Sequence, residues 1–548
     1  MIPIFFLAVV LGVACGVISF LRDRQSRLAD RLVRGILPAC GVLAVGLALR
    51  HAVYVVYPAW GAARVAVTDS LALGYSLYYP KDSGPVLGVV YTPLYFLFYL
   101  PVTLFATPTA AILAGALLSC VYAMAPQFWL YLKTERLPER APLWTWGCAI
   151  CSLVLACSLF AITYAIFPVR GDAPMLGLCM LACGLIYYHR EPGWRVSLLS
   201  AALVALAVWT KQTAVIAVLA LPLFLWVADG WRTMLRYAAS LGITGAVVSL
   251  GFGLFLPLEA FFFRTVQYPA RHPWFRYSCF QPDAPPGSCT VATSWLDRLV
   301  SMGWMAQKYL NEYLWVFLLA GILVALSLSR WGGGASPTRA WLCRHRWTAF
   351  LFLALLAAPM GIASRVKTGG EDSAFALCLY FFLPVLLLGA RDLAAQSPPA
   401  NSVAKVLVVA VLLFSLAASL SKFASFPRLL AGLPDNPHEA AYRYLKRHPG
   451  RAYFPFTPLA SILAQKTAYH YDWVIQEMWS SGFPVSPQHF QAYIPPGFEY
   501  IAYPPNFGDY QPRTALKLLP EFSEQVQLAE LPGWAVFRRP AANSQKHP

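Results

Sequence analysis

The sequence has very little charge. Asp, Glu, Lys and Arg make up 12% of its 548 residues, whereas a soluble domain usually carries about 25%. So few charged side chains cannot cover a soluble surface, and the mean hydropathy is +0.55. Apolar runs long enough to cross a bilayer as helices, about 17–25 residues, recur until about residue 420. The composition excludes an ordinary soluble protein and predicts an all-α polytopic membrane protein.

Acidic residues are scarcer than basic ones. The chain has 25 Asp and Glu against 42 Lys and Arg, a net charge of +17. In a soluble protein this excess would suggest nucleic acid, but no basic-aromatic module is present. In a membrane protein, basic residues mark cytoplasmic loops and contact anionic lipid. We therefore expect membrane lipids as partners and no nucleic acid.

Twelve transmembrane helices are predicted from the apolar runs. They lie near residues 3–21, 35–57, 109–132, 143–167, 174–188, 195–210, 213–228, 236–256, 313–329, 347–363, 375–390 and 404–421. The first run has neither a basic segment before it nor a clear cleavage site, so we expect a retained helix. In this arrangement the basic loops all fall on one side, which the positive-inside rule makes cytoplasmic. They are residues 22–34, 133–140, 190–195, 232–236, 330–346 and 391–405. The prediction is a multi-pass protein of the inner (plasma) membrane with both termini extracytoplasmic.

The opposite side carries the longer loops. We expect a first outer loop at 58–108, a second at 257–312, and a small extracytoplasmic α/β domain at 422–548. Residues 86–105 are apolar enough to enter the membrane, but a span there would place two basic loops outside. An interfacial or re-entrant helix is preferred, because Tyr91, Tyr95 and Tyr99 suit the headgroup layer and prolines interrupt the segment.

Most of the twelve cysteines lie in apolar runs and are interpreted as small core residues. Cys279 and Cys289 differ, because they share a polar, Pro-rich loop of the predicted outer side. A disulfide between them is expected in an oxidising compartment, and the alternative is two free thiols. No His/Cys cluster indicates a structural metal site.

Charged side chains gather beside apolar helices on the outer side. Carboxylates there could serve acid–base chemistry, and cations could hold a phosphate. Each has a plainer interpretation: a helix cap or dipole partner for Asp172, a headgroup contact or a pair with Asp172 for Arg170, snorkelling for Lys211, and turn or cap roles for the others. The set comprises Asp69, Asp82, Arg170, Asp172, Lys211, Arg365, Lys367, Glu371 and Asp372.

The order of these motifs resembles that of a known family. The stretch "GYSLYYP" followed by "VYTPLYFLFYLP", then "VRGDAPMLGLCMLACGL", "LAVWTKQTAVIAVLALPLFL" and "KTGGEDSAFALCLYFFLPVLLLG" is similar to the pattern of GT-C membrane glycosyltransferases. The nearest type is the protein mannosyltransferase and aminoarabinose transferase group (family 39). The resemblance spans residues 35–420, which would form the catalytic transmembrane domain, with residues 1–34 as an extra helix and basic loop before it.

The resemblance implies an inverting transfer of a sugar from a polyprenyl-phosphate donor to an acceptor hydroxyl on a protein, lipid or glycan. Asp69 would be the base with Asp172 in support, or Asp172 itself the base. Arg170, Lys211 and Lys367 would hold the phosphate. Tyr75, Tyr78 and Tyr91 would pack against sugar or lipid. No cofactor is required, although a divalent ion is compatible with the carboxylates and phosphate.

Two other functions stay open. Many relatives carry an Asp-Glu pair in the first loop, and here Trp60-Gly61 stands where those acids are expected. A catalytically silent lipid-binding scaffold of the same fold is therefore one alternative. The other is a transporter or flippase of a lipid-linked solute, but a transporter should show internal repeats and charges at mid-membrane. The sequence shows no repeat, and its outer charges gather at one face.

Overall fold

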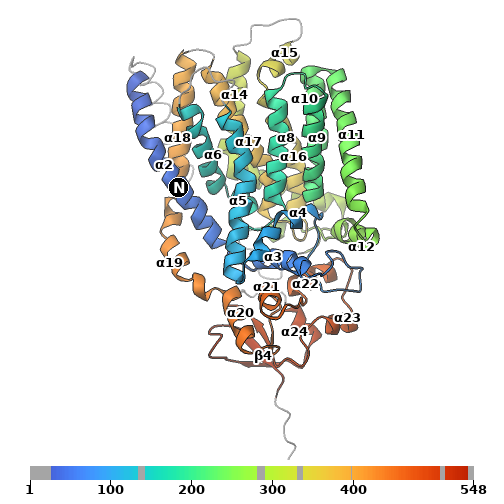
Figure 1. The fold of residues 1–548 in the computed structure, drawn as a ribbon. Helices are drawn as coiled ribbons and strands as arrows, with labels where there is room; N and C mark the ends of the chain where they lie inside the picture. Colours follow the sequence, from blue (N-terminus) through green and yellow to red (C-terminus); the bar gives the residue numbers. More distant parts are fainter. Residues whose placement is uncertain are drawn as a thin grey trace, which may run out of the picture.

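The computed structural model describes residues 26–133, 142–280, 290–329, 337–395, 398–505 and 513–540. Long helices run side by side and form a bundle, and a small α/β domain covers one end of it (Figure 1). The helices of the bundle are α2 (Ser26–Tyr54), α5 (Pro108–Leu132), α6 (Trp146–Ser158), α7 (Phe160–Ile166), α8 (Asp172–Tyr188), α9 (Trp194–Thr210), α10 (Val215–Asp229), α11 (Trp231–Gly253), α14 (Trp295–Ser329), α16 (Thr348–Arg365), α17 (Ala376–Ala394) and α18 (Pro398–Phe423).

The chain is a multi-pass membrane protein. Ten of the eleven predicted spans between residues 35 and 421 each fall on one of these helices, and the span 143–167 is divided between α6 and α7. The predicted span 3–21 lies outside the described residues. In the part of the chain that the structure describes, seven helices are long and apolar enough to cross a membrane, and α6 with α7, bent by 96°, makes an eighth. The helices at 172–188, 194–210 and 407–423 are apolar but shorter.

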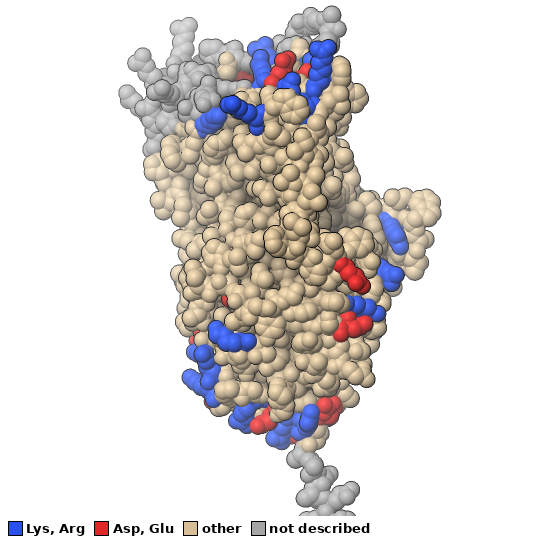
Figure 2. Space-filling model, turned by 45° about the vertical axis from the view of Figure 1, so that its right-hand side comes forward, with Lys and Arg blue, Asp and Glu red and all other residues tan. Residues whose placement is uncertain are grey.

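Burial differs sharply between the helices and follows their composition. The apolar stretch at 372–394, which contains α17, is 94% buried, whereas that of α11 is 11% buried. A helix that is apolar all round belongs in the interior of a bundle when protein surrounds it, and faces lipid when it does not. We therefore assign α17 to the core and α11 to the lipid-facing surface. Figure 2 shows one face with a broad belt nearly free of charged side chains between the two ends.

The basic loops meet at the end of the bundle away from the α/β domain, which we call the basic end. Helix α15 (Pro337–Arg344) lies there (Figure 1). Arg339 donates hydrogen bonds to the carbonyl oxygens of Ala228 and Asp229, and Arg190, Arg344 and Arg391 line one pocket. Four of the six predicted cytoplasmic loops therefore share one end, as the charge pattern predicts.

Residues 86–105 do not form a span. The chain makes helix α3 (Ala59–Ala72), an irregular stretch, then the short helices α4 (Leu94–Phe98) and η1 (Leu100–Leu104). Tyr95 and Tyr99 are fully buried, and their hydroxyls donate to the carbonyl oxygens of Val169 and Arg170. The sequence interpretation placed both rings in the headgroup layer. Both rings lie inside the protein instead, where their hydroxyl groups supply donors to backbone carbonyls that are shielded from water.

The C-terminal domain, residues 437–540, combines short helices with a four-stranded sheet of order β1-β2-β4-β3. Strand β1 is parallel to β2, and the other pairs are antiparallel. A short link of α19 (Phe426–Ala431) and η7 (Leu433–Asp435) precedes the domain. Its elements are α20 (Pro437–Arg447), β1 (Ala452–Tyr453), α21 (Pro458–Gln465), α22 (Asp472–Ser480), α23 (Pro487–Ala492), β2 (Tyr500–Tyr503), α24 (Thr514–Leu518), β3 (Glu524–Val526) and β4 (Ala535–Arg538).

Hydrogen bonds fix the C-terminal domain to the first loop. The Val86 N–H donates to His470 Nδ1 over 2.9 Å, and the Tyr471 N–H donates to the Val86 carbonyl over 2.8 Å. His489 Nε2 lies 2.8 Å from the Gly84 carbonyl oxygen. These contacts join residues about 400 positions apart. Through them the C-terminal domain and the first loop pack together at one end of the bundle. We call this the domain end.

Candidate functional site

Asp172 and Lys211 form a buried ion pair at the domain end. Asp172 is the first residue of α8, and Lys211 directly follows α9. The Lys211 ammonium lies 2.6 Å from Asp172 Oδ1, and both side chains are buried. Each helix has 17 residues and is about 26 Å long, shorter than the ~30 Å hydrocarbon core. The pair therefore lies at the ends of two short apolar helices and is enclosed by protein.

The glycine between Arg170 and Asp172 permits this close approach. A Cβ atom at Gly171 would lie 3.2 Å from the Thr210 carbonyl oxygen and 3.5 Å from the Tyr95 ring. Thr210 immediately precedes Lys211, so a larger residue would push apart the two chain segments that carry the ion pair. The sequence "RGD" thus places two charged side chains around a point of tight backbone packing.

Arg170 forms the second ion pair of the site. Its guanidinium pairs with Glu371 Oε2 and donates to Ser373 Oγ over 3.3 Å. The guanidinium also lies 4.4 Å from the centre of the Tyr164 ring, and the Tyr164 hydroxyl donates to Glu371 Oε1 over 3.2 Å. Glu371 therefore acts as the counter-ion of Arg170.

Arg64 is a third cation, and sequence reasoning missed it. Its Nη1 donates to the Gly88 carbonyl over 2.8 Å, and its guanidinium lies 5.0 Å from the centre of the Tyr91 ring. The Lys211 ammonium lies 5.3 Å from the centre of the same ring, so the Tyr91 ring is close to two cations. Within the described residues Arg64 has no carboxylate at ion-pair distance. We define the polar cluster as Arg64, Tyr91, Arg170, Asp172, Lys211 and Glu371.

A cationic cavity of about 260 Å³ opens beside the polar cluster. Arg50 of α2, Lys422 of α18 and Arg170 supply three positive charges to its wall, and none of its described lining residues is acidic. Arg50 donates to Ser425 Oγ over 3.2 Å, and Lys422 donates to the Cys157 carbonyl over 3.1 Å. The other lining residues are apolar, aromatic or neutral: His51, Tyr54, Val55, Pro58, Trp60, Gly61, Phe160, Thr163, Tyr164, Phe167 and Pro168. Such a lining suits an anion attached to an apolar group.

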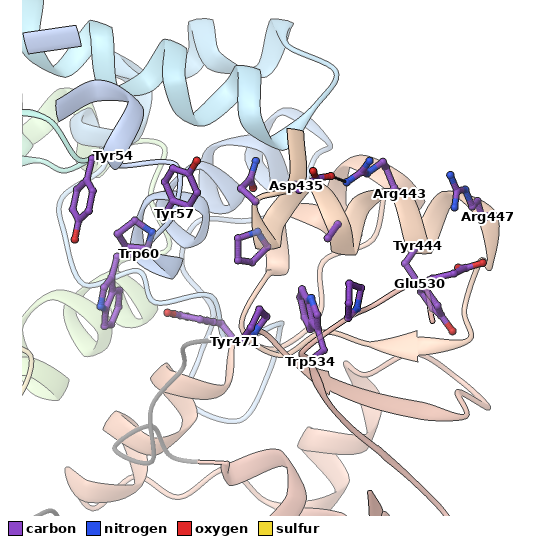
Figure 3. Close-up of a pocket in the computed structure, with 16 residues that line it drawn as sticks. Tyr54, Tyr57, Trp60, Asp435, Arg443, Tyr444, Arg447, Tyr471, Glu530 and Trp534 are labelled. Atoms are coloured by element: carbon purple, nitrogen blue, oxygen red, sulfur yellow. Dashed lines mark hydrogen bonds and ion pairs between the residues drawn. The ribbon is translucent and has the colours of Figure 1, made fainter. Parts of the chain in front are cut away.

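An aromatic cleft of about 740 Å³ lies between the bundle and the C-terminal domain. Tyr54, Tyr57 and Trp60 lie on its bundle side, facing Tyr444 and Trp534 of the domain (Figure 3). Its other lining residues are Pro58, Asp435, Asn436, Pro437, Ala440, Arg443, Arg447, Tyr471, Pro505, Glu530 and Pro532. Tyr54, Pro58 and Trp60 line both the aromatic cleft and the cationic cavity. The two spaces are therefore neighbours that share one wall.

Asp69 lies apart from the polar cluster. It lines a separate cavity of about 360 Å³ together with Lys466, Thr103 and neighbouring apolar residues. Asp69 is five residues beyond Arg64 on α3, and at 3.6 residues per turn it points about 140° away around the helix. Burial raises the pKa of Asp69 to about 7, an effect that the Lys466 ammonium opposes. Its Oδ2 atom is buried without a hydrogen-bond partner among the described residues.

The other predicted site residues are also separated. The Lys367 ammonium lies 5.3 Å from the centre of the Trp274 ring, and burial lowers the pKa of Lys367. The Tyr78 hydroxyl donates to the Tyr91 carbonyl over 2.8 Å, and the Tyr75 hydroxyl accepts from the Ala468 N–H over 3.3 Å. The structure thus brings Arg170, Asp172, Lys211 and Tyr91 together, uses Tyr78 to support Tyr91, and places Asp69, Lys367 and Tyr75 elsewhere.

The predicted disulfide falls partly outside the described residues. Cys279 Sγ lies 3.7 Å from the Thr290 carbonyl oxygen, but Cys289 is not among the residues that the structure describes. The pairing of Cys279 with Cys289 stays a prediction. In the described ranges, no three His, Cys, Asp or Glu side chains lie close enough together to hold a metal ion.

The chain was compared with known proteins, and two solved structures are distantly similar to it. No protein-family model matches this sequence, and no curated protein matches it. A crystal structure of ArnT from Cupriavidus metallidurans bound to undecaprenyl phosphate is similar over 91% of this chain and 98% of that chain, with a TM-score of 0.41 and 15% identity. The structure of ArnT in the apo state is similar over 90% of this chain and 97% of that chain, with a TM-score of 0.41 and 14% identity.

Proposed function

We propose that this protein is a membrane glycosyltransferase that takes a sugar from a polyprenyl-phosphate donor. The observation that supports this most strongly is the cationic cavity, which has three basic side chains and no acidic one among its described lining residues. A lipid phosphate needs such an excess of donors, because a buried anion without counter-charges is costly. Phe160 and Tyr54 line this cavity and are also exposed at the surface. They could therefore contact the apolar polyprenyl chain of the donor.

The shared wall suggests where donor and acceptor meet. In the proposal, the donor phosphate lies among Arg50, Lys422 and Arg170, and the acceptor enters through the aromatic cleft. Tyr54 and Trp60 line both spaces, so the reacting sugar would lie against them. Aromatic rings with polar edges suit a sugar, which has apolar faces and hydroxyl groups.

The proposed transfer uses charged side chains of both the polar cluster and the cationic cavity. The acceptor hydroxyl oxygen attacks the anomeric carbon, its bond to the phosphate oxygen breaks, and the configuration inverts. The hydroxyl proton passes to a carboxylate, and the leaving phosphate keeps the electron pair of the broken bond. Arg170, Arg50 and Lys422 stabilise that negative charge, so the leaving group needs no proton.

Asp172 is the carboxylate that we assign as base. Asp172 does not itself line the cationic cavity, but it is two residues from Arg170, which does, and its Oδ2 atom is buried without a hydrogen-bond partner in the described part of the chain. Lys211 binds the other oxygen and orients the group. Asp69 is the alternative base, since its raised pKa of about 7 suits proton abstraction near neutral pH.

The orientation that we propose places the domain end outside the cytoplasm. Lys and Arg concentrate in the loops of the basic end, and the positive-inside rule assigns such loops to the cytoplasm. The aromatic cleft and the C-terminal domain would then face the acceptor side. A cysteine-accessibility experiment tests this: a single cysteine at Arg428 should react with a membrane-impermeant thiol reagent from outside, and one at Arg232 should not.

A silent lipid-binding scaffold is the second candidate, and one observation favours it. Trp60 and Gly61, which stand where the family resemblance expects acids, line the cationic cavity. That cavity therefore lacks an acid at the place where the resemblance puts one. Protein in lipid discs, a panel of polyprenyl-phosphate monosaccharides and an envelope extract as acceptor separate the two candidates. Release of polyprenyl phosphate from one donor, lost in Asp172→Asn, supports the transferase. Saturable donor binding without release supports the scaffold, and the absence of both binding and release favours the transporter alternative.

A further inference from the structure

A second cationic pocket lies at the basic end of the bundle, opposite the C-terminal domain. It forms where α8, the turn between α15 and α16, and the end of α17 meet, and its volume is about 380 Å³. We call it the arginine pocket. Its lining residues are Tyr187, Arg190, Arg344, Arg346, Trp347, Arg391, Asp392 and Ala395. None of them belongs to the polar cluster, the cationic cavity or the aromatic cleft.

Arg346 already has a counter-ion. Its Nη1 lies 2.7 Å from Asp229 Oδ1, and its Nε and Nη2 donate to the Ile186 carbonyl over 3.0 and 2.7 Å. The side chain is fully buried. Arg346 therefore acts as a structural cation that holds the C-terminal turn of α8.

Arg391 is buried with neutral partners. It is 3% exposed, and its Nη2 donates to the Tyr187 hydroxyl over 3.1 Å while Nη1 reaches the Tyr131 carbonyl at 3.5 Å. Within the described residues no carboxylate lies at ion-pair distance from it. A buried guanidinium with neutral partners alone carries a desolvation cost that a nearby anion would offset.

Arg190 and Arg344 are exposed members of the lining and complete the positive charge. In the described part of the chain neither of them forms a side-chain hydrogen bond or an ion pair. Asp392, the acid in the lining, is held by His345 Nδ1 and by the Trp347 Nε1–H over 3.1 Å. Four arginines and one aspartate line the pocket, and Asp229 balances Arg346 from just outside it. An excess of two positive charges remains.

Helix termini explain part of this arrangement but not all of it. Cations stabilise the carbonyl end of a helix, and Arg346 does this for α8. Arg190 and Arg344 form no hydrogen bond to a helix carbonyl among the described residues, so their charges do not stabilise a helix end in this way. Guanidinium groups match phosphate oxygens in pairs, and aromatic residues such as Trp347 and Tyr187 are typical of the headgroup level of a membrane. A volume of about 380 Å³ is sufficient for a small polar group.

We propose that the arginine pocket binds a phosphate-bearing ligand, either the headgroup phosphate of an anionic lipid or a soluble phosphate ester. Arg190 and Arg344 would capture the phosphate, and Arg391 would contact it from the buried side. The site is separate from the proposed donor site and does not depend on the proposed transfer reaction. Its occupant would join α8, α15 and α17 at the basic end.

The test uses the full-length protein purified in detergent and stripped of lipid. Native mass spectrometry and thermal unfolding are measured with phosphatidylglycerol, with phosphatidylcholine and with glycerol phosphate. The proposal predicts saturable binding of phosphatidylglycerol or of glycerol phosphate, with an increase in the unfolding temperature. Binding of phosphatidylglycerol alone identifies a lipid, and equal binding of glycerol phosphate identifies a soluble ester. Equal binding of phosphatidylglycerol and phosphatidylcholine, with no binding of glycerol phosphate, overturns the proposal.

Variants assign the binding to the pocket. Arg190→Gln with Arg344→Gln changes two exposed side chains, so the fold should persist. We expect the double variant to bind at least tenfold more weakly, while the control Arg232→Gln, an exposed arginine of the start of α11 outside the pocket, binds within twofold of the wild type. If the double variant binds as well as the control, the pocket is not the site and the proposal is wrong.

Discussion

The Lys211 ammonium and the Asp172 carboxylate lie 2.6 Å apart where α9 ends and α8 begins. Both side chains are buried, and a second pair, Arg170 with Glu371, lies in the same cluster. Removing one partner of a buried pair leaves a charge without compensation, at a cost of about 3–5 kcal/mol. A substitution in either pair is therefore expected to lower the stability of the protein as well as its activity.

A double-mutant cycle tests this coupling. Asp172→Asn alone and Lys211→Gln alone should each lower the unfolding temperature clearly, because each strands the partner's charge. The double variant should lose less than the sum of the two single losses, since it leaves no unpaired charge. Thermal unfolding in detergent is the measurement, and additive losses would show that the pair is not coupled.

The same double variant separates folding from catalysis. If Asp172 is the base, the double variant should stay folded and lose donor cleavage by a factor on the order of 10²–10⁴. Asp69→Asn should then keep most of the activity. The opposite result, with activity lost in Asp69→Asn and kept in the double variant, would assign the base to Asp69.

Asp69 should lower stability at alkaline pH. Its folded-state pKa of about 7 lies above the ordinary aspartate pKa of 3.8, so its neutral form favours folding below pH 3.8, and that contribution is lost as pH rises to about 7. At pH 8 the buried carboxylate is charged, and Asp69→Asn should stabilise the protein by up to about 4 kcal/mol. The measurement is the difference in unfolding temperature between wild type and variant at pH 5 and pH 8. A difference that does not grow with pH would contradict the assignment.

Mild acid should weaken the attachment of the C-terminal domain through His470. Its Nδ1 accepts the Val86 N–H, and burial lowers the pKa of His470 from 6.5 to about 3. Its neutral form stabilises the fold fully above pH 6.5, and this contribution is lost as pH falls toward 3.

The pH dependence of unfolding checks this. Each proton taken up on unfolding costs about 1.4 kcal/mol per pH unit, so stability should fall between pH 6.5 and 4. His470→Gln should reduce the slope of stability against pH by about 1.4 kcal/mol per pH unit, the effect of one proton. His448→Gln, an exposed histidine of the same domain paired with Glu530, is the control that should leave most of the slope in place.

Chelators should leave donor cleavage intact. The carboxylates of the polar cluster are already paired with cations, Asp172 with Lys211 and Glu371 with Arg170, and the proposed phosphate site has Arg50 and Lys422 as cations of its own. We expect wild-type rates with EDTA within about twofold of those with added Mg²⁺ or Mn²⁺, measured as released polyprenyl phosphate. A loss of activity with EDTA that metal restores would show that a divalent ion takes part.

The sequence predicted the helices well because each apolar run is long and continuous. It also placed Arg170, Asp172, Lys211 and Tyr91 on one side of the membrane, where the structure brings them together. The order of the spans predicts on which side of the membrane a charged residue lies, because the chain changes side at every span. The same counting placed Lys367 on that side, but it could not tell that Lys367 packs on Trp274, away from the cluster.

The cationic cavity could not be predicted from the sequence. Arg50 and Lys422 lie near the ends of α2 and α18, 372 residues apart, and only the packing of these helices brings them together. Arg64 had a local signal, a single arginine in the mixed apolar stretch "GAARVAV", which the search for acids in that loop passed over. Asp69 stood out as the nearest acid in the first loop, but its direction around α3 depends on which face of the helix is buried.

The most direct test of the central claim is donor cleavage in Arg50→Gln with Lys422→Gln, compared with Arg428→Gln. Arg428 is an exposed cation of the nearby α19 that does not line the cationic cavity. Charge-assisted hydrogen bonds are worth about 1.5–3 kcal/mol each, so the double variant should bind and cleave a polyprenyl-phosphate sugar at least a hundredfold less efficiently, while Arg428→Gln behaves like the wild type. If the double variant releases polyprenyl phosphate at the wild-type rate, the cavity does not hold the donor phosphate and the proposed donor site is wrong.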